Sequence, residues 1–304
     1  MTAVEGSAAR VTNPGRRRRE ASLAYLLLLP AAVIFAVFVF FPFLKNFQLA
    51  FYKTPPFPGL PNKWAGFSQI TNVLGSSAFR NSLWVTVLFA ILTVPAGIFL
   101  GLLLALLANQ KLRGMAIYRT IFSSTVATSV AVASVVFGTL MSPQVGLLPW
   151  LGITPNPAIL NNPTLALPAV AITTIWQNLG LSFILMSAGL QSVPEDLQDA
   201  AKVDGAGTWT RFWRVTVPSL SPTIFFAAVI GSIFAFQTFG QIDLLTQGGP
   251  ENKTNVLTYF IVTQLHTNQN PGYAAVLSIA LFIITLALTL LQLRFLERRV
   301  TYAR

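Results

Sequence analysis

Long apolar runs dominate the pattern of hydrophobic and polar positions along the chain. Six of these runs are long enough to cross a bilayer as a helix, which takes about 20 apolar residues. None of the six contains an Asp, Glu, Lys or Arg, apart from Arg119 near the start of the third. The pattern therefore predicts an all-α integral membrane protein with six transmembrane helices. The predicted spans are residues 22–44, 82–108, 117–141, 165–190, 219–241 and 273–293.

Composition supports this fold class. Hydrophobic residues make up 54% of the 304 residues and charged residues only 10%, against about 25% in soluble domains. These values exclude a disordered chain, a collagen and a coiled coil. Cysteine is absent, which excludes a disulfide framework, a thiolate metal site and a cysteine nucleophile.

The distribution of Lys and Arg predicts the orientation. Fifteen of the 20 lie in the two terminal segments and in the segments after the second and fourth spans; five lie in the others. Cytoplasmic segments carry the excess of positive charge, so both termini are expected to be cytoplasmic. The net charge of +11 could suggest nucleic acid. However, the cluster Arg16–Arg19 precedes an apolar run and is typical of a topology signal, so we expect contact with membrane lipid and no nucleic acid.

These boundaries divide the chain into five parts. We expect a basic cytoplasmic tail over residues 1–21, the first span over 22–44 and an external loop over 45–81. A core of five spans follows over 82–294, and a second cytoplasmic tail covers 295–304. The first apolar run is too long for a usual signal peptide and five more spans follow, so we interpret it as a retained helix. In the external segment after the fifth span, residues 255–266 have the pattern of a short amphipathic helix, lying in the interface or packed on the bundle.

The predicted cytoplasmic segment 191–218 has an unusual acidic character, with four of the nine acidic residues of the chain. Ser192 and Glu195 have capping-box spacing at the start of a short helix, and Gly205 suits its end. A second amphipathic stretch, 209–216, follows. From these residues alone, two interpretations stay open: a connector lying on lipid headgroups, or a helix that docks in a groove of another protein.

Residues 195–207, continuing through Phe212 and Pro218 to Pro222, closely resemble the EAA loop of ABC-importer permease subunits. Asp199 stands where that family usually has glutamate, and residues 122–125 depart from a Leu-Pro pattern in the third span. In the family, this loop forms a coupling helix that sits in a cleft of a cytoplasmic ATPase. The resemblance therefore assigns that role to Glu195, Asp199, Ala200, Ala201, Asp204, Gly205 and Ala206.

Three further segments are similar to the carbohydrate-uptake branch of these permeases. They are 244–250, 142–148 and 294–302, the last being similar to the tail of the first permease subunit of glycerol-3-phosphate and glycerophosphodiester importers. The resemblance implies a multi-pass subunit of the bacterial cytoplasmic (inner) membrane. Its implied partners are a second permease, two ATPase subunits and an external binding protein. The implied solute is glycerol-3-phosphate or a glycerophosphodiester, with a neutral sugar as the second candidate.

The chain has no Gly-x4-Gly-Lys-[Ser/Thr] sequence for binding a nucleotide phosphate. We therefore expect no cofactor in this chain, with ATP and Mg²⁺ bound by the partner subunits. We expect no catalytic residue and no metal site either. An intramembrane enzyme would need a nucleophile with a base, or metal ligands, but the single histidine, His266, lies outside the spans. An ion-coupled secondary carrier stays the alternative, although such carriers need ionisable residues within the bundle.

Polar residues within the fourth and fifth spans are the candidates for the substrate path. Amides can bond the hydroxyls of a polyol or sugar, and an aromatic ring can cover its apolar face. The alternative is that these amides only join helices. A phosphate group would favour a cation in the site, and no span offers one. Three alternatives stay open: the partner permease supplies the cation, backbone dipoles are sufficient, or the solute is neutral. The candidates are Trp176, Gln177, Asn178, Phe236, Gln237, Thr238 and Gln241.

Overall fold

The computed structural model describes residues 14–55, 60–110 and 113–296. Within them the chain is mostly helical, and its strands form one short antiparallel pair, β1 (Tyr52–Lys53) and β2 (Lys63–Trp64). Two bent pairs of helices satisfy the length and hydropathy of a membrane span only when each pair counts as one. The predicted helical membrane fold is therefore confirmed, with four to six spans. The four long apolar helices are Leu23–Leu49, Ser77–Ala108, Ala166–Gln191 and Pro271–Arg294.

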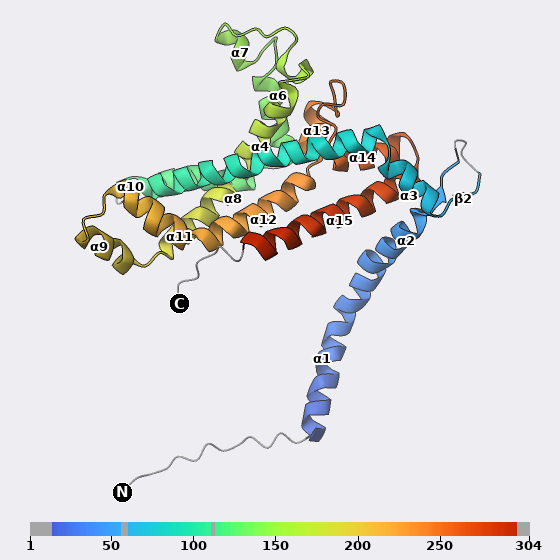
Figure 1. The fold of residues 1–304 in the computed structure, drawn as a ribbon, viewed down its shortest axis with the longest axis horizontal. Coiled ribbons are helices and arrows are strands. Elements are labelled where there is room, and N and C mark those ends of the chain that lie inside the picture. Colours follow the sequence, from blue (N-terminus) through green and yellow to red (C-terminus); the bar gives the residue numbers. More distant parts are fainter. Residues whose placement is uncertain (1–13, 56–59, 111–112, 297–304) are drawn as a thin grey trace.

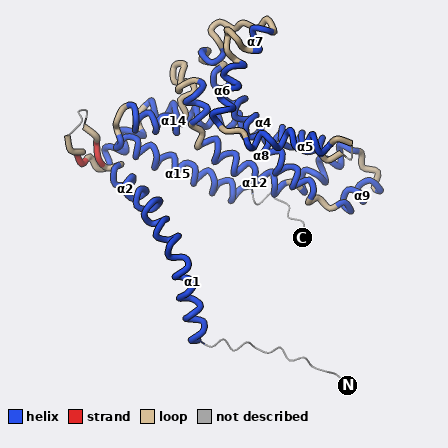
Figure 2. Tube along the Cα trace, turned by 180° about the vertical axis from the view of Figure 1, so that it is seen from behind, coloured by secondary structure: helices blue, strands red, loops and turns tan. Residues whose placement is uncertain are grey.

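Four helices run side by side as an elongated bundle (Figures 1 and 2): α4 (Ser77–Ala108), α8 (Ala166–Gln191), α12 (Ser221–Phe236) and α15 (Pro271–Leu296). Helices α4 and α8 pack closely where Gly101 faces Ser182. A Cβ atom added to Gly101 would lie 2.7 Å from the Cβ of Ser182. Because small residues let membrane helices approach closely, this glycine allows α4 and α8 to pack against each other at short range.

Three clusters of buried apolar side chains follow one another along α4. The first surrounds Phe79 and includes residues of α14 (Leu257–Val262) and α15. The second surrounds Phe89, which is fully buried between α8 and α12. The third surrounds Ala105, near the last turns of α8. The core is thus continuous from one end of the bundle to the other.

The first apolar helix stands apart from this bundle. It consists of α1 (Pro14–Phe35), the π-helical segment η1 (Ala36–Phe40) and α2 (Phe41–Leu49), and so continues past the predicted end at residue 44. Figure 1 shows α1 projecting away from the other helices. α2 reaches the bundle where the rings of Phe43 and Phe282 meet edge to face, 5.6 Å apart. All side chains from 23 to 44 are exposed, so this apolar surface is available to lipid or to another protein.

The third predicted span is not one continuous helix. It consists of α5 (Met115–Ser123), the 3₁₀ turn η2 (Ser124–Ala127) and α6 (Val130–Leu140), with a 104° bend before α6. The hydroxyl of Ser129 caps α6 by accepting a hydrogen bond from Val132 N at 3.2 Å. Gly180 of α8 lets η2 approach, since an added Cβ would lie 2.5 Å from Thr125 Oγ1. The prediction of a single helix over 117–141 is wrong, because this cap and this close contact change the direction of the chain.

The fifth predicted span, 219–241, also differs. Helix α12 ends at Phe236, residues 237–239 leave the helix, and α13 (Gly240–Leu245) follows. Gly240 allows α13 to reach α6, because an added Cβ would lie 2.6 Å from Val130 Cγ1. The polar residues after Phe236 therefore occupy a break. At its other end α12 meets a 63° bend, preceded by α10 (Thr208–Arg211), η4 (Phe212–Thr216) and α11 (Val217–Ser219).

Short elements complete the fold. The predicted amphipathic helix over 255–266 is present as α14 with η5 (Thr263–Thr267), and it packs on the bundle. Its Leu257 is fully buried and donates a backbone N–H to Thr86 Oγ1 of α4 at 2.8 Å. Helix α4 begins within the predicted external loop, and most of the predicted tails, 1–21 and 295–304, lies outside the described residues. The remaining elements are α3 (Phe67–Leu74), α7 (Leu147–Trp150), η3 (Ile159–Asn161) and α9 (Glu195–Val203).

Candidate functional site

A cavity of about 290 Å³ lies where α8 meets the breaks in the third and fifth predicted spans. Its polar lining comes largely from the residues that the sequence singled out, and no side chain in the lining is charged. Thr174, one turn before Asn178 on α8, lines it as well. Packing therefore gathers polar groups from two distant segments around one space. The predicted residues that line it are Gln177, Asn178, Gln237, Thr238 and Gln241.

A chain of hydrogen bonds joins the two breaks through α8. Gln177 Nε2 donates to the carbonyl oxygen of Thr128, 3.3 Å away at the bend of the third span. Gln241 Nε2 donates in turn to Gln177 Oε1 at 2.5 Å. Because the Thr128 carbonyl can only accept, it fixes which end of each amide faces the next. Gln177 thus holds both breaks in one relative position.

The other polar residues of the cavity differ in how much they are engaged. Asn178 Nδ2 donates to Thr174 O at 3.0 Å, and Thr238 Oγ1 donates to Phe234 O at 3.0 Å. The exposed side-chain amide of Gln237 has no hydrogen-bond partner among the described residues. Gln237 is therefore the amide most available to a solute.

The aromatic residues of the cavity are not the predicted ones. Trp176 packs against the ring of Phe137, with centroids 5.3 Å apart, and Phe236 is buried in the core. Phe234 and Phe239 line the cavity instead. The signal in the sequence that could have found Phe239 is the glycine that follows it, because a glycine within an apolar run can mark a break between two helices.

The second candidate region is α9, a short helix that lies where the sequence predicts one. Its end is set by Gly205, which has a φ of +77°, and by a hydrogen bond from Ala206 N to Ala201 O at 2.9 Å. The predicted capping box is wrong, because the Ser192 hydroxyl donates to Gly189 O at the end of α8. The candidate coupling residues Glu195, Asp199, Ala200, Asp204 and Gly205 are exposed, and Ala201 and Ala206 are half-buried.

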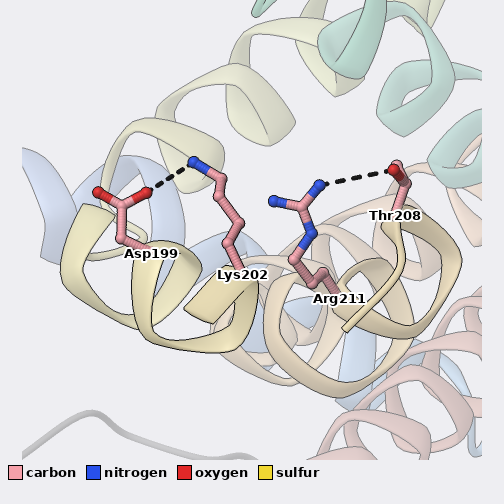
Figure 3. A network of polar contacts seen from close by, with 4 residues as sticks. All are labelled: Asp199, Lys202, Thr208 and Arg211. Carbon is pink, nitrogen blue, oxygen red and sulfur yellow. Dashed lines mark hydrogen bonds and ion pairs between the residues drawn. The ribbon is translucent and has the colours of Figure 1, made fainter. Parts of the chain in front are cut away.

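Charged side chains on this loop pair locally (Figure 3). Lys202 Nζ donates to Asp199 Oδ1 at 2.6 Å, and an Arg211 N–H donates to Thr208 Oγ1 at 3.5 Å. The hydrogen bond and the positive charge of Lys202 lower the pKa of Asp199. The exposed Asp204 side chain has no partner among the described residues, so its carboxylate is free to meet another protein.

Helix α9 is attached lightly to the rest of the molecule. Gln198 Nε2 donates to Thr216 Oγ1 of η4 at 3.0 Å, and Thr216 is buried. Behind α9 lies a cavity of about 630 Å³ that reaches Asn109 at the end of α4 and Gln191 at the end of α8. An exposed helix with this few contacts presents most of its surface outwards.

The fold and these two regions define a polytopic helical membrane protein with a polar cavity and a projecting helix. Residues 6–302 match the family described as binding-protein-dependent transport system inner membrane components. The chain belongs to this family: it is a permease subunit of an ABC importer in the bacterial inner membrane. This membership decides against the ion-coupled carrier and the intramembrane enzyme.

Curated relatives cover nearly the whole chain. An sn-glycerol-3-phosphate transport system permease protein UgpA from Agrobacterium fabrum is 35% identical, over 92% of this chain and 96% of its own. A UgpA from Yersinia pestis is 33% identical over the same shares. A crystal structure of a bacterial ABC transporter that imports alginate has a TM-score of 0.80 at 24% identity, covering 93% of this chain and 98% of that one. This last similarity shows the fold.

Proposed function

We propose that this chain forms one side of a solute channel, with the polar cavity on the path and α9 as the contact with a separate ATPase. In this proposal each bent pair of helices counts as one span, which gives six. Both termini are cytoplasmic, as the Lys and Arg distribution favours. Helix α9 then projects into the cytoplasm, and the β1–β2 hairpin lies outside.

The partners in the proposal are a second, similar permease, two ATPase subunits and an external binding protein. ATP and Mg²⁺ bind to the ATPase subunits. Helix α9 is exposed, ends at Gly205 and has the carboxylate of Asp204, unpaired among the described residues, beside that end. These features support a docking role, because such a helix can enter a groove of another protein. Movement of the ATPases would reach the bundle through Gln198 and Thr216, which connect α9 to the bend before α12.

The proposed solute is sn-glycerol-3-phosphate or a glycerophosphodiester, with a neutral sugar second. The relatives named above support the first choice. The observation that carries the path is that five polar candidates from two segments meet at one cavity in an otherwise apolar bundle. Their amides suit the hydroxyls of a glycerol unit. Because the cavity has no cation, the second permease would have to supply the charge for a phosphate.

A smaller, mostly apolar cavity of about 60 Å³ supports a path that runs from the polar cavity towards α9. It shares Thr174, Asn178 and Phe234 with the polar cavity and continues between α4, α8 and α12 to Leu185. Since α8 runs from Ala166 to Gln191, this cavity extends the polar one towards α9. A solute leaving the amides would therefore meet an apolar constriction next.

Uptake by the reconstituted complete importer tests the path. Labelled sn-glycerol-3-phosphate is offered with saturating binding protein, and a glycerophosphodiester or a neutral oligosaccharide competes. The Gln237→Leu variant should lose about fivefold in uptake rate, the worth of one hydrogen bond. Gln292→Leu is the matched control, because Gln292 joins α15 to Ser232 of α12 away from the cavity. Equal rates in wild type and Gln237→Leu would remove Gln237 from the path.

Cross-linking tests the docking of α9. The chain lacks cysteine, so Ala200→Cys gives this subunit a single thiol. A short bifunctional reagent should join it to the ATPase subunit. Gln144→Cys, exposed in the segment between α6 and α7, should give no such product. Absence of the ATPase adduct at position 200, with transport intact, would contradict the docking role.

A further inference from the structure

The β1–β2 hairpin occupies a defined position at one end of the bundle. It follows α2 directly, and it touches the first turn of α15, where the backbone N–H of Gly272 donates to Thr54 Oγ1 at 3.1 Å. A Cβ atom on Gly272 would collide with the carbonyl oxygen of Tyr52. Figure 1 shows the hairpin at the end of the bundle that α3 and α2 share. It therefore lies at the level where one long apolar helix, 23–49, ends and another, 271–294, begins.

Aromatic rings form one half of this feature. The indole of Trp64 stacks on Phe51 at 5.7 Å and meets Tyr52 edge to face at 5.2 Å, and Phe67 packs edge-on against Phe51 at 5.5 Å. Although they support one another, Trp64 is 67% exposed and Phe67 is 75% exposed. Exposed aromatic rings at the end of an apolar span are typical of the headgroup level of a bilayer.

Lysines form the other half. In the ladder, Tyr52 pairs with Trp64 and Lys53 pairs with Lys63. Strand alternation therefore places the two aromatic residues on one face and the two lysines on the other. Like charges directly opposite each other destabilise a strand pair. Both lysines are exposed, and neither has an acidic partner among the described residues.

The surrounding segment carries no acidic residue to compensate. Residues 45–81 contain Lys45, Lys53, Lys63 and Arg80, and no Asp or Glu. These four cations lie on the side of the membrane where the proposed topology has few, so the orientation signal does not account for them. A ribbon with an aromatic face and an unpaired cationic face fits a lipid surface, where rings reach the acyl boundary and ammonium groups reach phosphate.

We propose that the β1–β2 hairpin, through residues 51–55 and 60–67, anchors the subunit to anionic phospholipid of the outer leaflet. Trp64 and Phe67 lie among the headgroups and upper acyl chains, and Lys53 and Lys63 bind the lipid phosphate. The lipid neutralises the opposed ammonium groups and holds the first turn of α15 at a fixed depth. The proposal rests on the proposed topology, which places the hairpin outside.

The test uses the complete importer in nanodiscs of phosphatidylcholine mixed with phosphatidylglycerol. Asn62→Cys places a single thiol of this subunit beside the two lysines, and a photo-cross-linker on it samples the adjacent lipid. Mass spectrometry of the adducts should show more phosphatidylglycerol than the bulk mixture contains. Each lysine near an anionic membrane surface strengthens the attraction to anionic lipid by about fivefold. The double substitution Lys53→Gln with Lys63→Gln should therefore lower the enrichment of phosphatidylglycerol among the adducts by at least fivefold.

Two controls make the result specific. Lys53→Arg with Lys63→Arg retains the charge and should retain the lipid ratio. Lys253→Gln removes an exposed lysine of the turn between α13 and α14 and should leave the ratio unchanged. An unchanged ratio in the double glutamine variant overturns the proposal. A second outcome would point to a protein partner. If the double glutamine variant keeps its lipid ratio in the mixed nanodiscs but binds the binding protein more weakly in pure phosphatidylcholine, the hairpin recognises an acidic protein surface. The lipid anchor is then wrong.

A separate measurement distinguishes failure of the topology from failure of the anchor. In the Asn62→Cys variant, a membrane-impermeant maleimide should label the introduced thiol from the external side of intact cells. Labelling only after the cytoplasmic side is opened would overturn the proposed orientation, and with it the outer-leaflet anchor. External labelling together with a bulk lipid ratio at position 62 would overturn the anchor alone.

Discussion

The α9 loop and the polar cavity are both candidate functional regions, but they are built in opposite ways. Helix α9 is nine residues long, exposed, and held to the bundle by the Gln198–Thr216 hydrogen bond. The cavity joins Gln177 to Gln241, 64 positions apart in the sequence, through a half-buried amide pair. A short-range motif therefore makes the first region, whereas long-range packing makes the second. The two should respond differently to substitution.

The largest effect is expected at the end of α9. A β-branched residue at the positive φ of Gly205 costs about 1–2 kcal/mol, so Gly205→Val should unwind or redirect the last turn. ATP-driven uptake should fall more than tenfold, with the membrane helices still inserted. Gly207→Val is the matched control: its φ is −63°, and neither glycine has an atom within 4 Å of an added Cβ. Similar uptake in the two variants would show that the backbone at Gly205 does not set the coupling.

The contrast explains what the sequence could predict. The α9 helix and its glycine end follow from local propensity and one φ requirement, which a sequence displays directly. The predicted capping role of Ser192 is wrong, because its hydroxyl donates a hydrogen bond to Gly189 O in the last turn of α8 instead of accepting one from α9. Bilayer-length apolar runs likewise predicted the long helices, since the membrane sets their length.

The cavity could be predicted only in part. Its amides stand out as polar residues within apolar runs, but the faces they occupy depend on where the helices break. Because α12 stops at Phe236, helical periodicity no longer relates Phe236 to Gln241, and Phe239 takes the place expected of Phe236. The bend of the third span depends on the close contact between Thr125 of η2 and Gly180 of α8. This contact joins two separate apolar runs, so neither run alone predicts it.

An intermediate effect is expected for the amide chain. Gln177→Leu removes the partner of Thr128 O and of Gln241 Nε2. Unsatisfied polar groups in a low-dielectric site cost about 1–3 kcal/mol, and both helix breaks lose their common support. We expect uptake to fall about fivefold while the subunits still co-purify. Gln292→Leu, which removes an amide between α12 and α15, should affect stability more than uptake rate. If both variants reduce uptake equally, Gln177 only joins helices.

The smallest effect is expected for the ion pair on α9, which also has a defined pH dependence. The lowered pKa of Asp199 means that the pair contributes stability above the carboxyl group's ordinary pKa, about 3.9. That contribution is lost as the pH falls through the lower, folded-state pKa. At neutral pH the pair is intact but exposed, and exposed pairs contribute little.

Comparing two variants of this pair separates local stabilisation from contact with the ATPase. Lys202→Gln removes the pair but keeps the carboxylate, and it should change uptake less than about twofold. Asp199→Asn removes the carboxylate itself. If Asp199 meets a basic residue of the ATPase, this second variant loses more uptake than the first, and Asp199→Glu retains it. Raising the salt concentration should reduce the difference, since exposed charges are screened. Equal effects of the two substitutions would confine Asp199 to the stability of α9, and the docking charge would then have to come from Glu195 or Asp204.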